Sequence, residues 1–154
     1  DPKGEGVMNR PPRDPERGIV GRRMLGVIAA TGAVTTVVML GLMAFALEGA
    51  AVVTPYAMTM VFTGFVFLEF EKLYVIRWLR ETPTLSNPWL AAAVAGSAVV
   101  QLAVLYTPLN QYFGTVPLGL TDWGIIAVVL LVCLPIYVAI AALIRRTTGT
   151  DPSR

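Results

Sequence analysis

The sequence contains no histidine and, among its 154 residues, a single cysteine, Cys133. The absence of histidine excludes every metal site or acid–base catalyst that depends on an imidazole group. One cysteine excludes a disulfide within the chain, and it leaves the redox compartment undetermined. Because Cys133 lies inside a long apolar run, we expect it to be a small buried hydrophobic residue.

Charged residues are scarce as well, at 14% of the chain compared with about 25% in an ordinary soluble domain. Four stretches contain no Asp, Glu, Lys or Arg, and each approaches or exceeds the roughly 20 apolar residues that a helix needs to cross a bilayer. These stretches are residues 24–47, 49–68, 88–121 and 123–144. They lack the polar–apolar alternation of a transmembrane barrel strand, so helices are the expected spanning structure.

The sequence therefore predicts an all-α integral membrane protein with a bundle of four transmembrane helices. The spans are expected at residues 24–47, 55–78, 89–106 and 123–144, within a membrane domain of residues 24–146. Residues 1–23 are expected to form a Pro- and Arg-rich cytoplasmic arm, and residues 147–154 a polar cytoplasmic tail. Because the chain begins at Asp1 rather than Met, we expect a cut or incomplete gene product.

The connections between the spans follow from turn-forming residues. The segment 48–54 is so short that the first two spans should form an antiparallel hairpin. Residues 82–88 predict a turn, and residues 107–121 predict an uncharged loop because prolines and glycines interrupt them. Asp122 is expected to cap the fourth span, and Pro135 to kink it.

The Lys and Arg residues indicate the orientation of the spans. Of the 12, six lie in the arm, three lie near or after the end of the second span and three follow the fourth, while the loops 48–54 and 107–122 contain none. By the positive-inside rule both termini are cytoplasmic, and we expect the plasma membrane as the location. The net charge of +2 gives no indication of nucleic acid binding, so membrane lipid is the expected partner.

Glu69, Glu71 and Lys72 interrupt the second predicted span. A helix that begins at Pro55 reaches Glu69 after about 21 Å, which is still inside a hydrocarbon core about 30 Å thick. An ionisable side chain at this depth costs on the order of a few kcal/mol unless it meets protein, water or an ion. These residues are therefore the candidate functional site.

Two roles for Glu69 remain open on the local sequence. Lys72 lies three residues further on, and the two side chains can form an ion pair inside the membrane. Alternatively, Glu69 is a cation ligand, and most of its site then lies outside this chain, because a hard cation needs several oxygen ligands. The other spans offer few polar groups that could assist: Thr31, Thr35, Thr36, Ser97 and Gln101. Glu71 lies about 160° around the helix from Glu69 and can snorkel towards the cytoplasmic interface.

Three parts of the sequence resemble P-type cation-transporting ATPases. The residues Asp1-Pro2 and Met8-Asn9-Arg10-Pro11-Pro12-Arg13 resemble the cytoplasmic loop between the sixth and seventh spans of that family. Asn87-Pro88-Trp89 is similar to the sequence before the ninth span. The third part resembles the loop between spans nine and ten: Tyr106-Thr107-Pro108-Leu109, Phe113-Gly114-Thr115-Val116-Pro117-Leu118 and Asp122-Trp123. The resemblance covers essentially the whole chain, in register with the four predicted spans.

The resemblance implies that this chain supplies spans seven to ten of such a pump, which brace the mobile ion-binding spans. It also implies that Arg10, Arg13 and Arg17 in the arm contact the catalytic domains, so the remaining domains of the ATPase are expected partners. The phosphorylated Asp loop, the nucleotide domain and the actuator loop are absent from the sequence. We therefore expect no enzymatic activity from the chain by itself, and no cofactor on it.

Glu69, within Phe67-Leu68-Glu69-Phe70, looks like a glutamate in the eighth span of calcium pumps of the sarcoplasmic reticulum type. The resemblance implies that Glu69 is a metal ligand for calcium or another cation in the complete pump. The family often continues with an Asn-rich stretch, whereas Glu71-Lys72-Leu73-Tyr74-Val75 follows here. This difference makes Lys72 the expected ion-pair partner and counter-charge of Glu69.

A second function also remains open, which is an autonomous four-helix accessory subunit or a small oligomeric channel derived from a pump. This alternative predicts a stable assembly without a pump partner. A third hypothesis is a degenerate gene fragment without activity.

We predict that epitope tags at both termini lie on the cytoplasmic side of the membrane, because all the Lys and Arg residues lie on that side. External protease should leave both tags intact in sealed cells and remove them after permeabilisation. A tag inserted in the loop 48–54 should show the opposite behaviour and serves as the control. Removal of either terminal tag from outside would contradict the predicted orientation.

Overall fold

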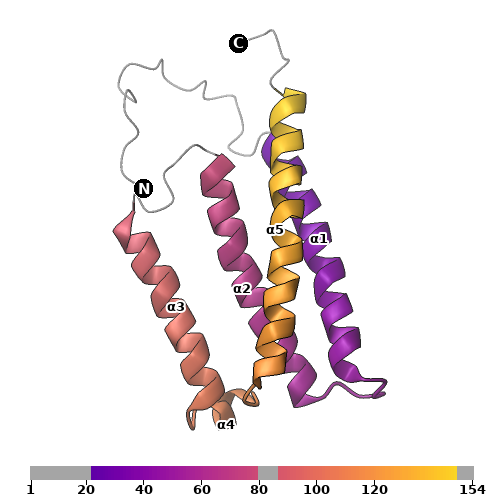
Figure 1. The fold of residues 1–154 in the computed structure, drawn as a ribbon, viewed down its shortest axis with the longest axis vertical. Helices are drawn as coiled ribbons and strands as arrows, with labels where there is room; N and C mark the ends of the chain where they lie inside the picture. The colour runs from indigo at the N-terminus through magenta and orange to yellow at the C-terminus, as the bar shows by residue number, and fades with distance from the viewer. Residues whose placement is uncertain (1–21, 80–86, 149–154) are drawn as a thin grey trace.

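The computed structural model describes residues 22–79 and 87–148, and its helices are shown in Figure 1. Within these ranges the regular structure is entirely helical, which confirms the all-α prediction. There are four long helices and one of a single turn: α1 (Arg22–Leu47), α2 (Pro55–Leu79), α3 (Pro88–Tyr106), α4 (Asn110–Phe113) and α5 (Leu120–Thr148). Most of the predicted arm, turn and tail lies outside the described residues.

The four long helices lie side by side and alternate in direction (Figure 1). Helices α1, α2 and α5 contact one another pairwise. Helix α3 lies on the outer side of α2, and it joins the core near its carboxyl end, where Leu105 is fully buried. The predicted antiparallel hairpin is present, since α1 and α2 are connected by the short segment 48–54.

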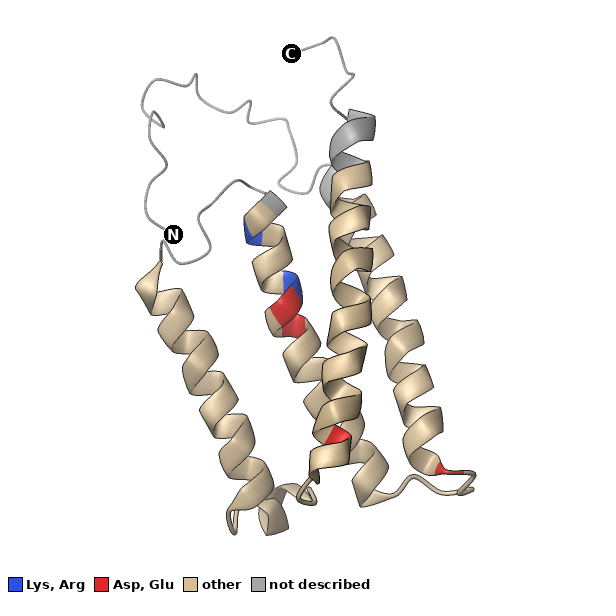
Figure 2. Ribbon diagram, viewed as in Figure 1, with Lys and Arg blue, Asp and Glu red and all other residues tan. Residues whose placement is uncertain are grey.

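Three of the described helices are long and apolar enough to cross a membrane: Leu25–Leu47, Pro88–Tyr106 and Leu120–Leu143. Helix α2 has 25 residues and is long enough to cross a membrane. It is not among these three because every stretch of it of spanning length contains the charged residues Glu69, Glu71 and Lys72. Figure 2 shows these charges in the second half of α2. The predicted range 55–78 lies within α2, so the helix itself exists, and its passage through the membrane remains a prediction.

All four long helices extend beyond the predicted spans, α2 and α3 by one residue and α1 and α5 by more. Helix α1 begins at Arg22, and α5 continues to Thr148, because Arg residues end an apolar run without ending a helix. Helix α3 begins at Pro88, where the side chain of Asn87 accepts hydrogen bonds from the backbone N–H groups of the next turn at 3.1 and 3.2 Å. An Asn cap followed by proline in the first turn is a favourable helix start.

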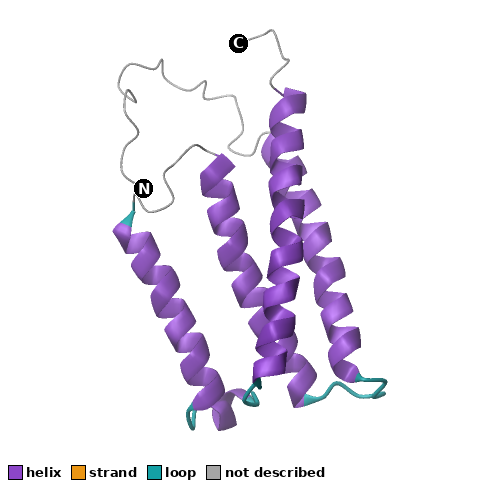
Figure 3. Ribbon diagram, viewed as in Figure 1, coloured by secondary structure: helices purple, strands orange, loops and turns teal. Residues whose placement is uncertain are grey.

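The loop that joins α3 to α5 carries the single-turn helix α4 and is otherwise irregular (Figure 3). Side chains fasten it to the long helices. The Thr115 hydroxyl donates to the carbonyl of Val104 at 3.0 Å, and the Thr59 hydroxyl accepts the N–H of Val116 at 3.1 Å. The Tyr106 hydroxyl donates to the carbonyl of Leu118 at 2.7 Å. The loop is therefore anchored on both α2 and α3.

Asp122 does not cap α5 as predicted. The helix begins at Leu120, so Asp122 lies in its first turn. One carboxylate oxygen of Asp122 accepts the N–H of Gly119 at 2.7 Å, and the other accepts the hydroxyl of Tyr56 at 2.7 Å. The prediction was wrong because it started the helix directly after Asp122. An acidic side chain in the first turn can instead accept a hydrogen bond from the backbone N–H of the residue before the helix. Asp122 thus joins the beginnings of α5 and α2.

The buried side chains between the helices form two clusters. The first lies towards the loops and contains Leu42, Ala46, Ala57, Met60, Leu105, Leu118 and Ile126. The second lies further along α2 and α5 and contains Leu68, Val75, Cys133, Tyr137 and Ala141. The sulfur-bearing side chain of Cys133 is buried, as the sequence predicted.

Gly64 lies where α2 packs closely against side chains of α1. A Cβ atom at this position would stand 2.8 Å from Cδ2 of Leu42, which is itself buried. We predict that Gly64→Leu separates the two helices and lowers the free energy of unfolding by about 1–3 kcal/mol. Thermal unfolding of the chain in phospholipid nanodiscs, followed by circular dichroism, measures this effect.

Gly41→Leu is the matched control, because a Cβ atom at Gly41 meets nothing within 4 Å. This variant should unfold at nearly the same temperature as the parent chain. Equal losses of stability in the two variants would show that α1 and α2 do not pack closely at Gly64.

Candidate functional site

The described ionisable Asp, Glu, Lys and Arg side chains are concentrated on α2. Only two lie elsewhere in the part of the chain whose side chains are described, namely Glu48 in a loop and Asp122 in α5. The others are Glu69, Glu71, Lys72 and Arg77, all in the second half of α2 (Figure 2). This half of α2 is the candidate site.

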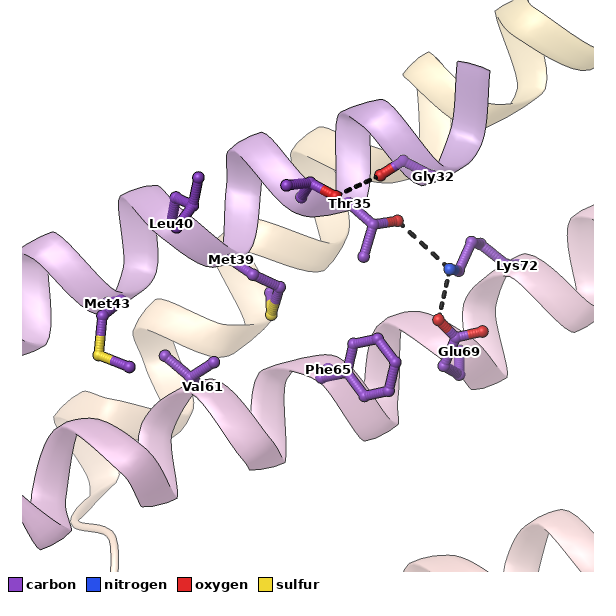
Figure 4. Close-up of a pocket in the computed structure, with 10 residues that line it drawn as sticks. Gly32, Thr35, Met39, Leu40, Met43, Val61, Phe65, Glu69 and Lys72 are labelled. Atoms are coloured by element: carbon purple, nitrogen blue, oxygen red, sulfur yellow. Dashed lines mark hydrogen bonds and ion pairs between the residues drawn. The ribbon is translucent and has the colours of Figure 1, made fainter. Parts of the chain in front are cut away.

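Lys72 connects α2 to α1. Its ammonium group forms an ion pair with Glu69 one turn earlier, and it also donates to the hydroxyl of Thr35 on α1 at 3.3 Å (Figure 4). The Lys72 side chain is 15% exposed, whereas the Glu69 side chain is 44% exposed. The ammonium group is therefore enclosed between the helices, and the carboxylate faces an open side of α2.

The hydroxyl of Thr35 is fully occupied by hydrogen bonds. It lies 2.8 Å from the carbonyl oxygen of Thr31, 2.8 Å from the hydroxyl of Tyr137 and 3.3 Å from Nζ of Lys72. A hydroxyl has one proton to donate and two acceptor positions. A carbonyl oxygen can only accept a hydrogen bond, and an ammonium group can only donate. Thr35 therefore donates to Thr31 and accepts from both Lys72 and Tyr137.

A polar chain consequently runs through three helices, from Glu69 and Lys72 on α2, through Thr35 on α1, to Tyr137 on α5. Thr35 is 6% exposed and Tyr137 is fully buried. Local sequence patterns did not reveal the last step, because the two residues are 102 positions apart. The one available signal was a hydroxyl group in each of two otherwise apolar helices.

Two cavities border Glu69. The first, of about 470 Å³, lies between α1 and α2 and is lined by Thr35 and Thr36 among mostly apolar side chains (Figure 4). The second, of about 620 Å³, lies between α2 and α3 and is lined by Ser97 and Gln101. The structure thus brings four of the five predicted helper residues next to Glu69. Glu69 lines both cavities, the one towards α1 and the one towards α3.

The helper groups already have hydrogen bonds of their own. The Thr36 hydroxyl donates to the carbonyl of Gly32 at 2.9 Å. The side-chain amide of Gln101 donates to the hydroxyl of Thr63 at 3.1 Å, which links α3 to α2. In the described part of the chain, no three His, Cys, Asp or Glu side chains come close enough together to hold a metal ion. A cation at Glu69 therefore needs oxygen ligands from other segments.

Glu71 does not reach the membrane interface, contrary to the sequence expectation. Both of its carboxyl oxygens are buried, and none of the described residues forms a hydrogen bond with them. Glu71 shares a helix face with Leu68 and Val75, which pack against Cys133 and Tyr137 of α5. The expectation was wrong because this face of α2 is covered by α5, which leaves the side chain no route to the interface.

The remaining predicted contact residues, Arg10, Arg13 and Arg17, lie outside the described residues. The role of Glu69 as a cation ligand likewise stays a prediction.

We predict that Glu69 and Lys72 are energetically coupled. In a double-mutant cycle with Glu69→Gln and Lys72→Met, the coupling free energy should be on the order of 1 kcal/mol, because either single change leaves the other charge without its partner. Unfolding free energies in mixed detergent–lipid micelles measure each corner of the cycle.

The control cycle pairs Lys72→Met with Glu48→Gln, because Glu48 lies in the loop after α1 and makes no ion pair with Lys72. The control changes should be additive. Additivity in the Glu69–Lys72 cycle as well would show that the ion pair contributes nothing to stability.

Comparison with known proteins identifies the family. A family model described as "Cation transporting ATPase, C-terminus" matches residues 1–144. The chain is 27% identical over 157 residues to proteins called "Probable cation-transporting ATPase F" in Mycobacterium tuberculosis and Mycobacterium bovis, with 99% of this chain and 17% of each relative covered. It is 46% identical over 55 residues to "Calcium-transporting ATPase 4, endoplasmic reticulum-type" of Arabidopsis thaliana, which covers 35% of this chain and 5% of that protein. No solved structure matches the chain.

These matches confirm the resemblance that the sequence motifs indicated. The chain spans 17% of the length of the mycobacterial relatives, and the matching family model describes a C-terminal region without the catalytic domains. Because that model covers residues 1–144, the chain belongs to the family of cation-transporting ATPase C-terminal domains, found in P-type ATPases.

Proposed function

We propose that this chain is the transmembrane scaffold at the C-terminal end of a P-type cation-transporting ATPase, where it braces the ion-binding spans and contributes the carboxylate of Glu69 to the cation site. The observation that carries this proposal is the position of Glu69. Its side chain is 44% exposed, on a side of α2 where cavities separate it from α1 and from α3. A carboxylate in that position is available to segments that this chain does not contain.

In this proposal α2 crosses the membrane together with α1, α3 and α5. A helix of 25 residues is about 37 Å long, which exceeds a hydrocarbon core of about 30 Å. Its first fourteen residues, 55–68, are uncharged. The charged residues that follow have protein around them, because Lys72 is paired with Glu69 and both oxygens of Glu71 are buried. Charged groups that are paired or enclosed by protein are the kind that a spanning helix tolerates.

The arrangement of the helix ends supports the orientation that we propose. The start of α1, the end of α2 and the end of α5 lie at one end of the molecule (Figure 1). The Lys and Arg residues of the sequence belong to these ends and to the segments that adjoin them. The positive-inside rule places this end, and with it both termini, in the cytoplasm, in keeping with a plasma membrane pump.

The scaffold role is supported by the packing of the three-helix core. Helices α1, α2 and α5 are held together by two buried clusters and by the hydrogen bonds of Thr35 and Tyr137. Large apolar side chains remain exposed on all four long helices, including Trp89 at 84% and Val99 at 64% on α3. A close-packed core with apolar outer faces is suited to hold further spans in lipid. We infer that the arm, with Arg10, Arg13 and Arg17, contacts the catalytic domains of the pump.

The cation is expected to be one that oxygen ligands hold, such as calcium, because Glu69 is a carboxylate and no imidazole or thiolate lies beside it. The names of the relatives point to the same class, since one is a calcium-transporting ATPase and the others are cation-transporting ATPases. Lys72 neutralises Glu69 while no metal ion is bound.

Co-expression of this chain with the remaining domains of its pump tests the proposal. Cation-stimulated ATP hydrolysis should require both parts. Glu69→Gln should raise the cation concentration for half-maximal stimulation about tenfold, which corresponds to a loss of ~1.4 kcal/mol of binding free energy.

Glu48→Gln, in the loop after α1, is the matched control and should leave the cation dependence unchanged. An unchanged cation dependence in Glu69→Gln would reject the ligand role and leave the scaffold role intact. Full cation-stimulated hydrolysis by the other domains without this chain would reject the scaffold role.

A further inference from the structure

The single-turn helix α4, between α3 and α5, presents large apolar side chains on one face. Tyr112 is 86% exposed and Phe113 is 64% exposed, and Leu109 before them is exposed as well. Leu109 has helical backbone geometry, and its carbonyl accepts the N–H groups of both aromatic residues at 3.0 and 3.2 Å. Residues three and four positions apart share a helix face, whereas Asn110 and Gln111 point to the other side. Leu109, Tyr112 and Phe113 are called the α4 apolar face below.

Hydrogen bonds fix the direction in which this face points. Gly114 ends α4 with a positive φ of 65°, and its N–H bonds back to the carbonyl of Asn110. The next two residues, Thr115 and Val116, are bonded to α3 and to α2. The exposure of the α4 apolar face is therefore a property of an anchored loop. A face that is held in this way is prepared for contact with a surface outside the chain.

Helix α3 determines the depth of α4 in a membrane. Its 19 residues extend about 28 Å, which is close to the thickness of a hydrocarbon core of about 30 Å. If α3 crosses the membrane, Tyr106 at its end lies at the boundary of that core. The N–H of Asn110 bonds to the carbonyl of Thr107 at 3.0 Å, so a tight turn joins α3 to α4 (Figure 1). This turn keeps α4 at the level of the headgroups.

A second observation gives the same depth. The ring N–H of Trp123, in the first turn of α5, donates to the hydroxyl of Tyr106 at 2.6 Å. The end of α3 and the beginning of α5 therefore lie at one level, on either side of the loop. Tyrosine and tryptophan side chains favour the boundary between lipid and water. Leu120, the first residue of α5, is 93% exposed and extends the apolar surface towards α4.

The charge of the loop favours lipid as the partner of this surface. Residues 88–121 contain no Asp, Glu, Lys or Arg, so no charged side chain of the loop holds it in water. The polar side chains of α4 are uncharged amides on the face opposite to the apolar one. A short segment with one apolar and one polar face adjoins two apolar helices that are long enough to span a membrane. This arrangement is typical of a segment that lies in the membrane interface.

We propose that the α4 apolar face is an interfacial anchor, which inserts Leu109, Tyr112 and Phe113 into lipid at the extracytoplasmic surface of the membrane. Asn110 and Gln111 face the headgroups and water. The anchor holds the end of α3 at a fixed depth. The proposal rests on the proposed passage of α3 through the membrane, and it is independent of cation binding.

Solution NMR of the full chain in phosphatidylcholine–phosphatidylglycerol nanodiscs tests the anchor without a change of sequence. A lipid with a nitroxide near the headgroup end of its acyl chain broadens the signals of side chains in the interface. A water-soluble gadolinium chelate broadens those of side chains in water. The lipid nitroxide should broaden the ring signals of Tyr112 and Phe113 several times more than the side-chain amide signal of Gln111. The chelate should act in the reverse order.

Stronger broadening of Tyr112 and Phe113 by the chelate than by the nitroxide overturns the anchor. Protection of both rings from both probes also overturns it, since a second copy or another protein then covers them. Val99, an exposed residue within α3, separates this failure from that of the proposed spans. If Val99 is protected from the chelate, only the anchor is wrong. If the chelate reaches Val99 as well, the proposed passage of α3 is wrong too.

A pair of variants tests the apolar face directly. Tyr112→Asp places a charge on this face and should expose the methyl groups of Leu109 to the chelate, because a carboxylate opposes insertion into lipid. Gln111→Asp is the matched control, because it places the same charge on the polar face, and the Leu109 signals should stay unchanged. Equal broadening of Leu109 in the two variants would overturn the proposal.

Discussion

The enclosed ammonium group of Lys72 is the interaction on which the polar interior of this protein depends. A positive charge among apolar helices must be neutralised, and Glu69 supplies the opposite charge from the same helix. A second N–H of Lys72 donates to the hydroxyl of Thr35, which also accepts from Tyr137. One charge thus determines how α1, α2 and α5 are oriented around it. Apolar contacts alone would leave those orientations weakly specified, because lipid is as apolar as the helix interior.

Helix α2 has two different sides as a result. One side is closed: Leu68 and Val75 pack on α5, and the carboxyl oxygens of Glu71 are buried between them. The other side is open around Glu69, with a cavity towards α1 and a larger one towards α3. Helix α3 closes this side only in part, since its described polar link to α2 is the bond between Gln101 and Thr63. One closed and one open side of α2 are in keeping with a domain that associates with the other domains of an ATPase.

The sequence alone predicted the helices well, because the length of an uncharged run reports directly on membrane thickness. It also predicted the hairpin between α1 and α2 and the position of Glu69 in the second half of α2. It failed where the answer depends on rotation about a helix axis. Lipid-facing and protein-facing positions are equally apolar in α3 and α5, so the sequence could not show that Glu71 faces α5 or that Tyr137 reaches Thr35. Asp122 was misplaced for a different reason, because a charged residue at the boundary of an uncharged run does not mark where a helix begins.

The charges around Glu69 limit how a metal ion can bind there. Glu69 and Lys72 together have no net charge, so a divalent cation placed beside them would meet one carboxylate and one ammonium group at close range. Repulsion between the cation and the ammonium group would then offset the attraction of the carboxylate. Binding therefore requires that Lys72 turns away from Glu69, or that other spans bring further carboxylates. The first change breaks the bond to Thr35 and frees an acceptor position on its hydroxyl, which lines the same cavity as Glu69. Displacement of the ammonium group would thus free a hydroxyl oxygen on α1 in the cavity that also borders Glu69.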